Sequence, residues 1–360
     1  MFQATTSKIQ FWGYRLATIL KSVKTLYSLP QEKVDTFLNS YNIYDHDWAN
    51  EKELTEKMGT DYYQQVQKKL VDYYSVLNHL CSIGQVEKMY IPPAMDLSVS
   101  IIANQKLYEK KMCQDLGIKK GQQVLDIGCG RGRVANHVAS FTEANVTGIN
   151  IDPNQLHSAQ QFARGNGLSR QCQFKIHDLN DLPLPFQNNS FDAVYQIQVF
   201  TYAKDLEKLF KDIYRVLKPG GKLACLDWVS LKNYSAENPH HARLMKQIKP
   251  LIGAIGTHSD EQYVSALKRA GFEIVVEKNA SIDGLQAPLI ENADRFFTRI
   301  TSFIRLFVKW RILPKHFSAL FDRLTQDGQA FIEADRLRLV TTSYYIVAKK
   351  PSLKKKPRRK

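Results

Sequence analysis

The stretch "VLDIGCGRGR", Val124 to Arg133, joins an apolar strand, a glycine-rich turn and the start of a helix. Asp126 lies at the end of the apolar run, and Gly128, Gly130 and Gly132 follow at alternate positions. Missing Cβ atoms let a ligand approach the backbone, and free N–H groups at a helix start attract a carboxylate or phosphate. A dinucleotide fold more usually shows GxGxxG directly after the strand. The stretch therefore predicts a cofactor loop, although a loop of this spacing alone carries little weight.

Strands and helices alternate on either side of this loop, which predicts a largely parallel sheet with crossover helices. Strands are expected at residues 122–128, 145–151, 172–178, 191–199, 222–229, 273–278 and 341–350. Helices are expected at residues 133–141, 154–168, 204–221 and 260–272, and within 282–339. Glycines such as Gly165 and Gly220 are expected to end them. Ser259 and Gln262 form a plausible capping box. The fold class is therefore α/β, a doubly wound, mostly parallel, seven-stranded sheet.

Composition narrows the class of protein further. A chain of 360 residues with 44% apolar side chains can bury a substantial core. It holds no run of about 18 uncharged apolar residues and no secretory signal, which favours the cytosol or the cytosolic face of a membrane. The five cysteines form no CxxC pair and are expected to be reduced thiols. No histidine spacing matches a metal site, so no metal is predicted.

Positive charge is concentrated at the C-terminus. Eight of the fifteen excess positive charges lie in "KKPSLKKKPRRK", residues 349–360. Such a tail is typically a solvated, disordered end, and the alternatives are attraction to anionic lipids or a nuclear-import-like cluster. No aromatic residue interleaves with these charges, which argues against a nucleic-acid partner.

The N-terminus has the pattern of a basic amphipathic helix. Apolar residues recur at helical intervals, with lysine and arginine on the flanks: Ile9, Trp12, Leu16, Ile19, Leu20 and Val23. The helix either packs on its own domain or lies in a membrane interface. From Pro30 to about Met112 the pattern is mostly helical, with a break at Pro92 and Pro93.

Asn150 stands where a nucleotide-binding fold usually places an acid, about 20 residues after the glycine loop. An amide both donates to and accepts from a ribose hydroxyl, so it can keep part of that contact. Asp152, two residues further on, is a second residue that could share the role.

The order of glycine loop, "VTGINID", "HDLNDLPLPFQNNSFDAVY" and "RVLKPGGKL" resembles class I S-adenosylmethionine-dependent methyltransferases. The resemblance implies S-adenosylmethionine as cofactor. It places Asp126, Gly128 and Gly130 in the cofactor loop, where the two glycines would line the methionine part of the cofactor. Asn150 would face the ribose of the cofactor. Ile151 would pack on the adenine, and Asp178 with Leu179 would meet its edge. Gln196 would lie near the methionine end.

Residues 107–351 are similar to the sterol C-24 methyltransferases, which tend to carry asparagine at the position of Asn150. The stretch "LDWVSLKNYSAENPHHARLMKQI" resembles their Glu-Trp strand and the segment after it, with Asp227 in place of the glutamate. Hydrophobic pattern and charge predict a helical N-terminal region with a membrane-surface helix (1–105) and a basic tail (351–360). Between them the similarity implies the cofactor-binding core (106–279) and a C-terminal region like that of sterol methyltransferases, with a helical insertion (280–350).

The chain departs from that family where proton-transfer groups are expected. The family's "IEATCHA" reads "IQVFTYA" here, so Gln198 replaces a glutamate and Tyr202 a histidine. Its aromatic, glycine-rich block is replaced by "YYSVLNHLCSIGQVEKMYIPPAMD". An alkene acceptor would form a carbocation that aromatic faces stabilise and a base must deprotonate. The predicted catalytic residues are Asp227, Tyr202, Gln198 and Trp228, with His79 as a further base candidate. Tyr195 and Phe200 are further candidates for aromatic residues that surround the carbocation, although ordinary core packing explains aromatic residues at such positions equally well.

The activity expected is C-methylation of a sterol, a triterpenoid or another lipophilic acceptor. The alternatives are an O- or N-methyltransferase of small molecules and a relative that binds the cofactor without catalysis. The N-terminal helix and the basic tail suggest peripheral contact with the endoplasmic reticulum or lipid droplets. The sequence leaves the oligomeric state open, a homo-oligomer included.

Overall fold

The computed structural model describes residues 16, 18–47, 51–83 and 88–352. Contacts divide the chain into two compact units. The first contains the described part of Met1–Met89 together with Arg243–Gly253 and Ile290–Glu333. The second contains Tyr90–Ala242, Ala254–Leu289 and the described part of Ala334–Lys360. The second unit carries the glycine loop and the sheet.

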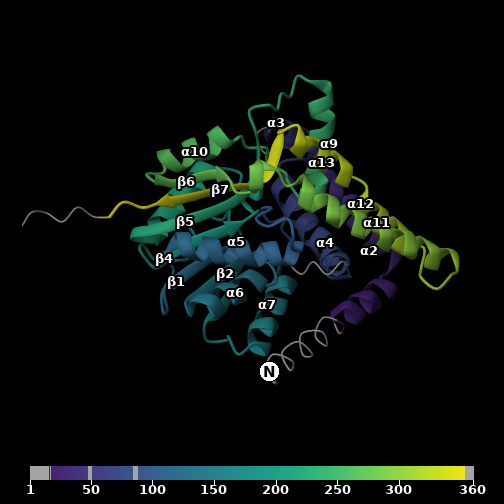
Figure 1. Ribbon diagram of the computed structural model, residues 1–360, viewed down its shortest axis with the longest axis horizontal. Helices are drawn as coiled ribbons and strands as arrows, with labels where there is room; N and C mark the ends of the chain where they lie inside the picture. The colour runs from purple at the N-terminus through teal and green to yellow at the C-terminus, as the bar shows by residue number, and fades with distance from the viewer. Residues whose placement is uncertain (1–15, 17, 48–50, 84–87, 353–360) are drawn as a thin grey trace, which may run out of the picture. The chain divides into compact units, whose positions relative to one another are not determined.

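The second unit is built on a seven-stranded sheet of order β3-β2-β1-β4-β5-β7-β6. Its strands are β1 (Gln123–Ile127), β2 (Asn145–Asn150), β3 (Cys172–Ile176), β4 (Phe191–Ile197), β5 (Leu217–Ser230), β6 (Glu273–Asn279) and β7 (Val340–Lys349). The first five run parallel, and β7 is antiparallel to both β5 and β6, between which it lies (Figure 1). The predicted doubly wound, mostly parallel sheet is confirmed. The strand order reverses between β1 and β4, which is where such sheets bind ligands.

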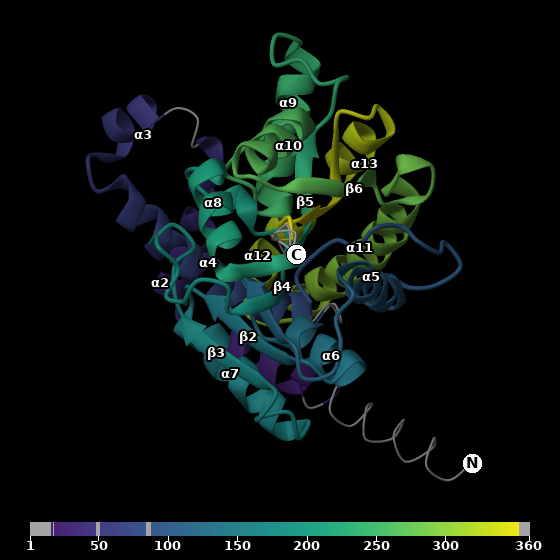
Figure 2. The same cartoon turned by 90° about the vertical axis from the view of Figure 1, so that its left-hand side faces the viewer.

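Helices connect the strands of this sheet. In the second unit they are α5 (Ile101–Leu116), α6 (Arg133–Thr142), α7 (Pro153–Gly165), η2 (Phe200–Tyr202), α8 (Leu206–Val216), α10 (Asp260–Arg269) and η3 (Ile282–Gly284). Figure 2 shows α7 lying against β3. Side chains cap several helix starts, including Asp152 on α7 and Asp205 on α8. Ser259 and Gln262 form the predicted capping box of α10.

The first unit is helical in its described part. It contains residues 18–27 and the elements α2 (Gln31–Ser40), η1 (Tyr41–Asp45), α3 (Glu51–Met58), α4 (Tyr62–Ile83), α9 (Pro239–Ile252), α11 (Ala287–Lys309), α12 (His316–Thr325) and α13 (Gly328–Arg336), of which α9, α11 and α13 extend into the second unit. Among the described residues, no helix is both long and apolar enough to cross a bilayer. Ile9 and Trp12 of the predicted amphipathic helix lie outside the described residues, as does the tail from residue 353. The predicted domain limits stay predictions, and α5 runs across the one after residue 105.

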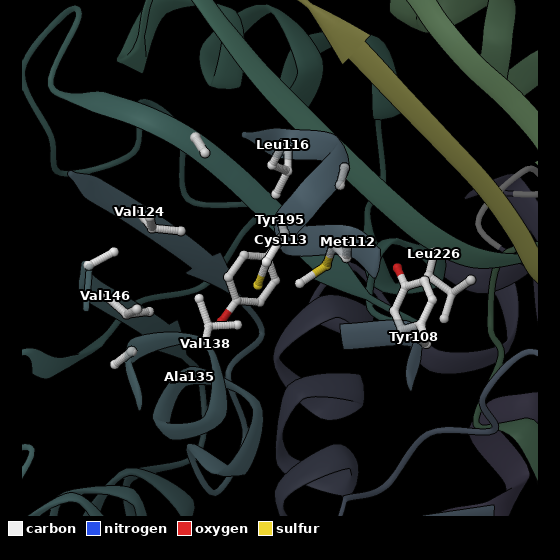
Figure 3. Packing of buried hydrophobic residues seen from close by; sticks show 14 of the residues in the cluster. Tyr108, Met112, Cys113, Leu116, Val124, Ala135, Val138, Val146, Tyr195 and Leu226 are labelled. Carbon is white, nitrogen blue, oxygen red and sulfur yellow. The ribbon is translucent and has the colours of Figure 1, made fainter. Parts of the chain in front are cut away.

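The core beneath the glycine loop lies between α5, α6 and the sheet. Met112, Cys113 and Leu116 of α5 lie close to Tyr195 of β4, and Val138 of α6 lies near the same ring (Figure 3). Met112 and Tyr195 are completely buried. Truncating a buried side chain such as Met112 to alanine costs about 2–5 kcal/mol. This packing fixes α5 and α6 on the sheet and so positions the loop.

Two expectations about the chain near Gly220 were wrong. The helix predicted for residues 204–221 ends at Val216, because Pro219 lacks an N–H and disfavours helical backbone at Lys218. The residues from Leu217 onward belong to β5. Lys350, predicted to lie in a solvated tail, is instead buried, and its Nζ donates to the carbonyl oxygens of Tyr214 and Leu217 at 2.7 Å. Its charge caps the end of α8.

Candidate active site

All three glycines of the loop have positive φ, at 75° for Gly128, 51° for Gly130 and 68° for Gly132. A Cβ at Gly128 would lie 2.4 Å from Cγ2 of Val199. A Cβ at Gly132 would lie 2.7 Å from Cβ of Ala159. L-residues rarely adopt this backbone conformation, and these distances leave no room for a methyl group. The loop therefore requires glycine at both positions for its own packing.

The loop ends at a helix start whose N-cap residue is a glycine and so has no side chain to cap it. Gly132 is the N-cap of α6 and makes no side-chain cap hydrogen bond. The N–H groups of Gly128 and Cys129 both donate to the carbonyl oxygen of Ile149, at 2.9 and 3.0 Å, which ties the loop to β2. An uncapped helix start keeps N–H groups and a positive dipole end for an anionic ligand.

Asn150 ends β2 with a buried amide nitrogen, Nδ2, that has no hydrogen-bond partner in the part of the chain that the structure describes. A buried polar group left unpaired costs about 1–3 kcal/mol, so a ligand hydroxyl placed here would be stabilising. The backbone oxygen of Asn150 accepts from the N–H of His177 at 3.0 Å, which holds the ends of β2 and β3 together. Asp152 has a local task, because its Oδ1 accepts from the N–H groups of Asn154 and Gln155 at the start of α7. That cap uses Oδ1 alone, whereas Oδ2 of Asp152 is buried and, like Nδ2 of Asn150, has no hydrogen-bond partner among the described residues.

The residues predicted to meet the adenine lie at the same edge of the sheet. Ile151 is half-buried, and Leu179 is buried. Oδ1 of Asp178 accepts from the backbone N–H of Asn180 at 2.8 Å. The amide of Asn180 in turn donates to the carbonyl oxygen of Tyr202 at 2.9 Å. These bonds bring the segment after β3 beside η2, so residues far apart in sequence share one edge.

Asp126 lies beneath the loop. Its carboxylate is buried and accepts a hydrogen bond from the hydroxyl of Tyr195 at 2.9 Å. Burial raises the pKa of Asp126 to about 7, the Tyr195 hydrogen bond opposes this rise, and the nearby charge of Glu109 adds to it. The structure thus places the side chain of Asp126 in the core, next to the ring of Tyr195.

Gln196 and Asp227 meet in a buried network between β4 and β5. Nε2 of Gln196 is 3.0 Å from Oδ2 of Asp227 and 3.1 Å from the hydroxyl of Tyr263. The Tyr263 hydroxyl also donates to Oδ2 of Asp227 at 3.2 Å. Oε1 of Gln196 accepts from the N–H of Val199. Tyr263 carries no signal in the sequence, because it lies on α10, 36 residues after Asp227, and has the spacing of an ordinary core residue.

Asp227 is also bonded to the backbone around it. Its Oδ2 accepts from the N–H of Phe200 at 3.1 Å and its Oδ1 from the N–H of Trp228 at 2.9 Å. Burial raises the pKa of Asp227 to about 7, although these hydrogen bonds lower it. The carboxylate therefore fixes the start of η2 and is enclosed by the chain.

The aromatic candidates are all buried. Phe200 packs edge-on against Phe210, and Tyr195 belongs to the core described above. Trp228 donates through Nε1 to the carbonyl oxygen of Gly256 at 3.1 Å. Tyr202 ends η2 and is 9% exposed. The structure thus fits core packing for Tyr195 and Phe200, whereas Tyr202 lies at the edge of the sheet near Asn180.

His79, the further base candidate, lies in the first unit, with Nδ1 3.2 Å from Oγ of Ser22.

Gln198 binds the backbone on both sides. Its φ of 53° is unusual for a residue other than glycine. Nε2 donates to the carbonyl oxygens of Ile91 and Thr342 at 2.7 and 2.8 Å, and Oε1 accepts from the N–H of Ile91 at 3.1 Å. The side chain thus pairs with Ile91 as a neighbouring strand would.

Ile91 belongs to a segment, Tyr90–Asp96, that we call the strap. Side chains bind most of its backbone groups: Gln105 at Tyr90, Gln286 at Pro92, Ser281 at Ala94, and Asn104 at Met95 and Asp96. The hydroxyl of Tyr90 also donates to Oε1 of Glu109 at 2.7 Å. Pro92 and Pro93 were the only sequence signal of this segment. The strap is thereby held against the end of β4, close to the predicted catalytic residues.

Comparison with known proteins identifies the class first. Residues 125–225 match the model of a methyltransferase domain. The cyclopropane synthase MmaA2 from Mycobacterium tuberculosis shares the fold, with a TM-score of 0.61 at 14% identity over 73% of this chain and 89% of that chain. Geranyl diphosphate C-methyltransferase from Streptomyces coelicolor A3(2), solved with S-adenosyl-L-homocysteine, gives 0.57 at 16% identity over 79% of this chain and 97% of that chain. The protein is a class I methyltransferase that uses S-adenosylmethionine.

Sequence relatives identify the family. The chain is 32% identical to sterol 24-C-methyltransferase ERG6B of Gibberella zeae, over 68% of this chain and 69% of the relative. It is 30% identical to cycloartenol-C-24-methyltransferase of Arabidopsis thaliana, over 68% and 76%. It is 29% identical to sterol 24-C-methyltransferase erg6 of Aspergillus fumigatus, over 81% and 79%. The chain belongs to the sterol C-24 methyltransferase family.

The residues present fit the cofactor. The orphaned Nδ2 of Asn150 can donate to a ribose hydroxyl, and the uncapped start of α6 can receive the methionine carboxylate. The predictions of fold, enzyme class and cofactor are thus confirmed, whereas the roles of individual residues remain predictions.

Proposed function

We propose that this enzyme methylates an alkene carbon of a sterol or related triterpenoid. The observation that carries the proposal is identity of 30–32% to enzymes named for sterol and cycloartenol C-24 methylation, over about two thirds of this chain. That similarity extends beyond the part of the chain that binds the cofactor, since the methyltransferase-domain match covers only residues 125–225.

S-adenosylmethionine, when bound, supplies a sulfonium methyl group for in-line transfer to a nucleophile. The electron pair of the acceptor's double bond forms the new C–C bond while the S–C bond breaks, and the acceptor carries the positive charge until a base removes a proton. The enzyme therefore has to hold the two reactants in line, exclude water and receive that proton. Asn150 is the residue that we assign to the ribose, and Ile151, Asp178 and Leu179 are those we assign to the adenine.

Within this proposal, three of the four residues predicted to be catalytic become positioning residues. The polar atoms of Gln198, Asp227 and Trp228 are bonded to the chain itself. Asp227 holds the start of η2, and Gln198 holds the strap. Tyr202, at the end of η2, is the residue that we assign to contact with the acceptor. A tyrosine stabilises a cation through its ring, whereas the family's histidine also accepts a proton.

Incubation with labelled S-adenosylmethionine and a panel of Δ24-sterols tests the proposal. Label is expected in the organic extract, in a product heavier by one carbon. Tyr202→Phe keeps the ring and is expected to retain more activity than Tyr202→Ala. Label found only in a water-soluble product would replace the proposal with an O- or N-methyltransferase. Cofactor binding without any labelled product would favour a relative that has lost catalysis.

Peripheral membrane contact belongs to the same proposal. A lipophilic acceptor resides in bilayers or lipid droplets, so we infer that the enzyme works at the cytosolic face of the endoplasmic reticulum or on lipid droplets. Imaging of the tagged full chain against markers of both compartments tests this location, and an even distribution through the cytosol would contradict it.

A further inference from the structure

One face of α11 and the turn after it expose a row of large apolar side chains. Phe303 is 62% exposed and Trp310 is 59% exposed. Other exposed members of this row are Phe296, Leu306, Phe307 and Ile312. Single exposed apolar residues are normal, whereas a contiguous row marks an interaction surface. We call these six residues the α11 face.

The row follows the geometry of the helix. At about 100° of rotation per residue, Phe296, Phe303, Phe307 and Trp310 fall within an arc of about 60°. The rings of Phe307 and Trp310 are 6.1 Å apart. Thr301 and Ile304, on another side of the same helix, are buried. Helix α11 thus already has a side that packs on the protein, and the α11 face is a second apolar side.

Charge indicates what covers this face. Residues 295–315 contain six cationic and no acidic side chains. All six are exposed: Arg295, Arg299, Arg305, Lys309, Arg311 and Lys315. Of these, Arg305 pairs with Asp322 at 2.8 Å. Aromatic residues flanked by lysine and arginine suit the headgroup region of a bilayer, where cations near an anionic surface strengthen binding.

A second basic, apolar helix lies in the same unit. Residues 18–27 are helical, with Leu20 and Tyr27 exposed and Lys21 and Lys24 between them. Nε2 of His316, at the start of α12, is 2.8 Å from the carbonyl oxygen of Leu26. This contact joins the helix of residues 18–27 to the start of α12, which follows the α11 face in the chain. The first unit thus exposes basic and apolar side chains on a second helix as well.

We propose that the α11 face docks on an anionic lipid bilayer. The face inserts Phe303, Phe307 and Trp310 among the headgroups, and the surrounding arginines and lysines pair with lipid phosphates and carboxylates. The six residues of the α11 face lie outside the N-terminal helix and the tail to which membrane contact was assigned from sequence, although residues 18–27 of that helix belong to the same unit.

Vesicle flotation with the full-length protein tests the docking. Vesicles are made from phosphatidylcholine with and without phosphatidylserine. The wild type is expected to bind the anionic vesicles more strongly. Phe303→Ser with Trp310→Ser is expected to lower binding to both kinds of vesicle by about tenfold or more. Lys309→Glu with Arg311→Glu is expected to lower binding to anionic vesicles by about tenfold or more and to leave binding to neutral ones unchanged.

The matched control is Phe141→Ser, which removes an exposed phenylalanine from α6 in the other unit and is expected to bind like the wild type. Thermal unfolding and cofactor titration of each variant verify that the fold is intact. Wild-type binding by both double variants would overturn the proposal. A change of sedimentation coefficient without a change in vesicle binding would assign the face to a second copy of the chain instead. Because no acceptor is used, failure here leaves the proposed reaction untouched.

Discussion

Replacing Gln198 with glutamate is expected to loosen the strap in a pH-dependent way. The amide nitrogen donates to two carbonyl oxygens, of Ile91 and Thr342, at 2.7 and 2.8 Å. A carboxylate donates to neither, and it places negative charge against both. Leaving two buried acceptors unpaired costs about 1–3 kcal/mol each. We therefore expect Gln198→Glu to lower the free energy of unfolding by about 3–5 kcal/mol at pH 8.

The sign of the pH dependence follows from the same contacts. A glutamic acid facing two carbonyl oxygens is stabilised in its protonated form, so its pKa in the folded state lies above the value of about 4.3 for an unfolded chain. Below about 4.3 the protonated group donates one hydrogen bond and part of the loss disappears. The loss grows as the pH rises and is complete once the pH exceeds the folded-state pKa.

The measurement is urea unfolding of the wild type and variants at pH 5 and pH 8, with differences taken from the wild type at each pH. Gln198→Met is the matched control, because it removes all three hydrogen bonds without adding a titratable group, and its loss is expected to be the same at both pH values. Kinetics are expected to show a raised KM for the acceptor and an unchanged cofactor Kd. The reasoning is refuted if the glutamate variant is as stable as the wild type at pH 8, or follows the methionine variant at both pH values.

Three further predictions concern the cofactor edge and the buried network. Asn150→Ala is expected to weaken cofactor binding by about fivefold to tenfold through loss of one hydrogen bond, whereas Asn150→Asp keeps it; equal affinities of all three forms in calorimetric titration would show that the residue is structural. Gly128→Ala is expected to cost about 2–4 kcal/mol, because its Cβ would lie 2.4 Å from Val199 at positive φ, whereas Gly165→Ala, where a Cβ has open space, is expected to be neutral or stabilising in thermal unfolding. Burial raises the pKa of Asp227 to about 7, so the ionised carboxylate lowers stability progressively as the pH rises from about 4 to about 7, by up to about 4 kcal/mol. Asp227→Asn is expected to flatten that part of the stability profile, and an unchanged slope between pH 4 and pH 7 would contradict the assignment.

The residues at the cofactor edge were largely accessible from sequence, because each lies where a parallel strand ends. Gly128 follows β1 directly, Asn150 is the last residue of β2, and Asp178 lies two residues after β3. The carboxyl ends of parallel strands meet at one edge of a sheet. The periodicity of the strands and the glycine spacing therefore predicted which residues come together. What could not be predicted is that Nδ2 of Asn150 is buried without a hydrogen-bond partner among the described residues.

The roles of the residues at the end of β4 could not be predicted in the same way. Gln198 was read as a substitute for a proton-transfer group, and its amide proved to bind Ile91 and Thr342, which lie 107 and 144 residues away. Asp227 was read as a base, and its carboxylate proved to be enclosed by Tyr263, Gln196 and the backbone of η2. Residue type alone does not reveal which hydrogen bonds a polar side chain makes, because that depends on long-range packing.

The sequence by itself thus determined the doubly wound sheet and the class of enzyme, and it predicted the strand ends to which we assign the cofactor, since these follow from local patterns repeated along the chain. Only the tertiary structure decided that Lys350 caps α8, that side chains from four separate segments hold the strap, and that α11 exposes a cationic, aromatic face. The physical reason is the same in each case. A hydrogen bond or an exposed face depends on which distant residues fold against a position, and local periodicity carries no information about those partners.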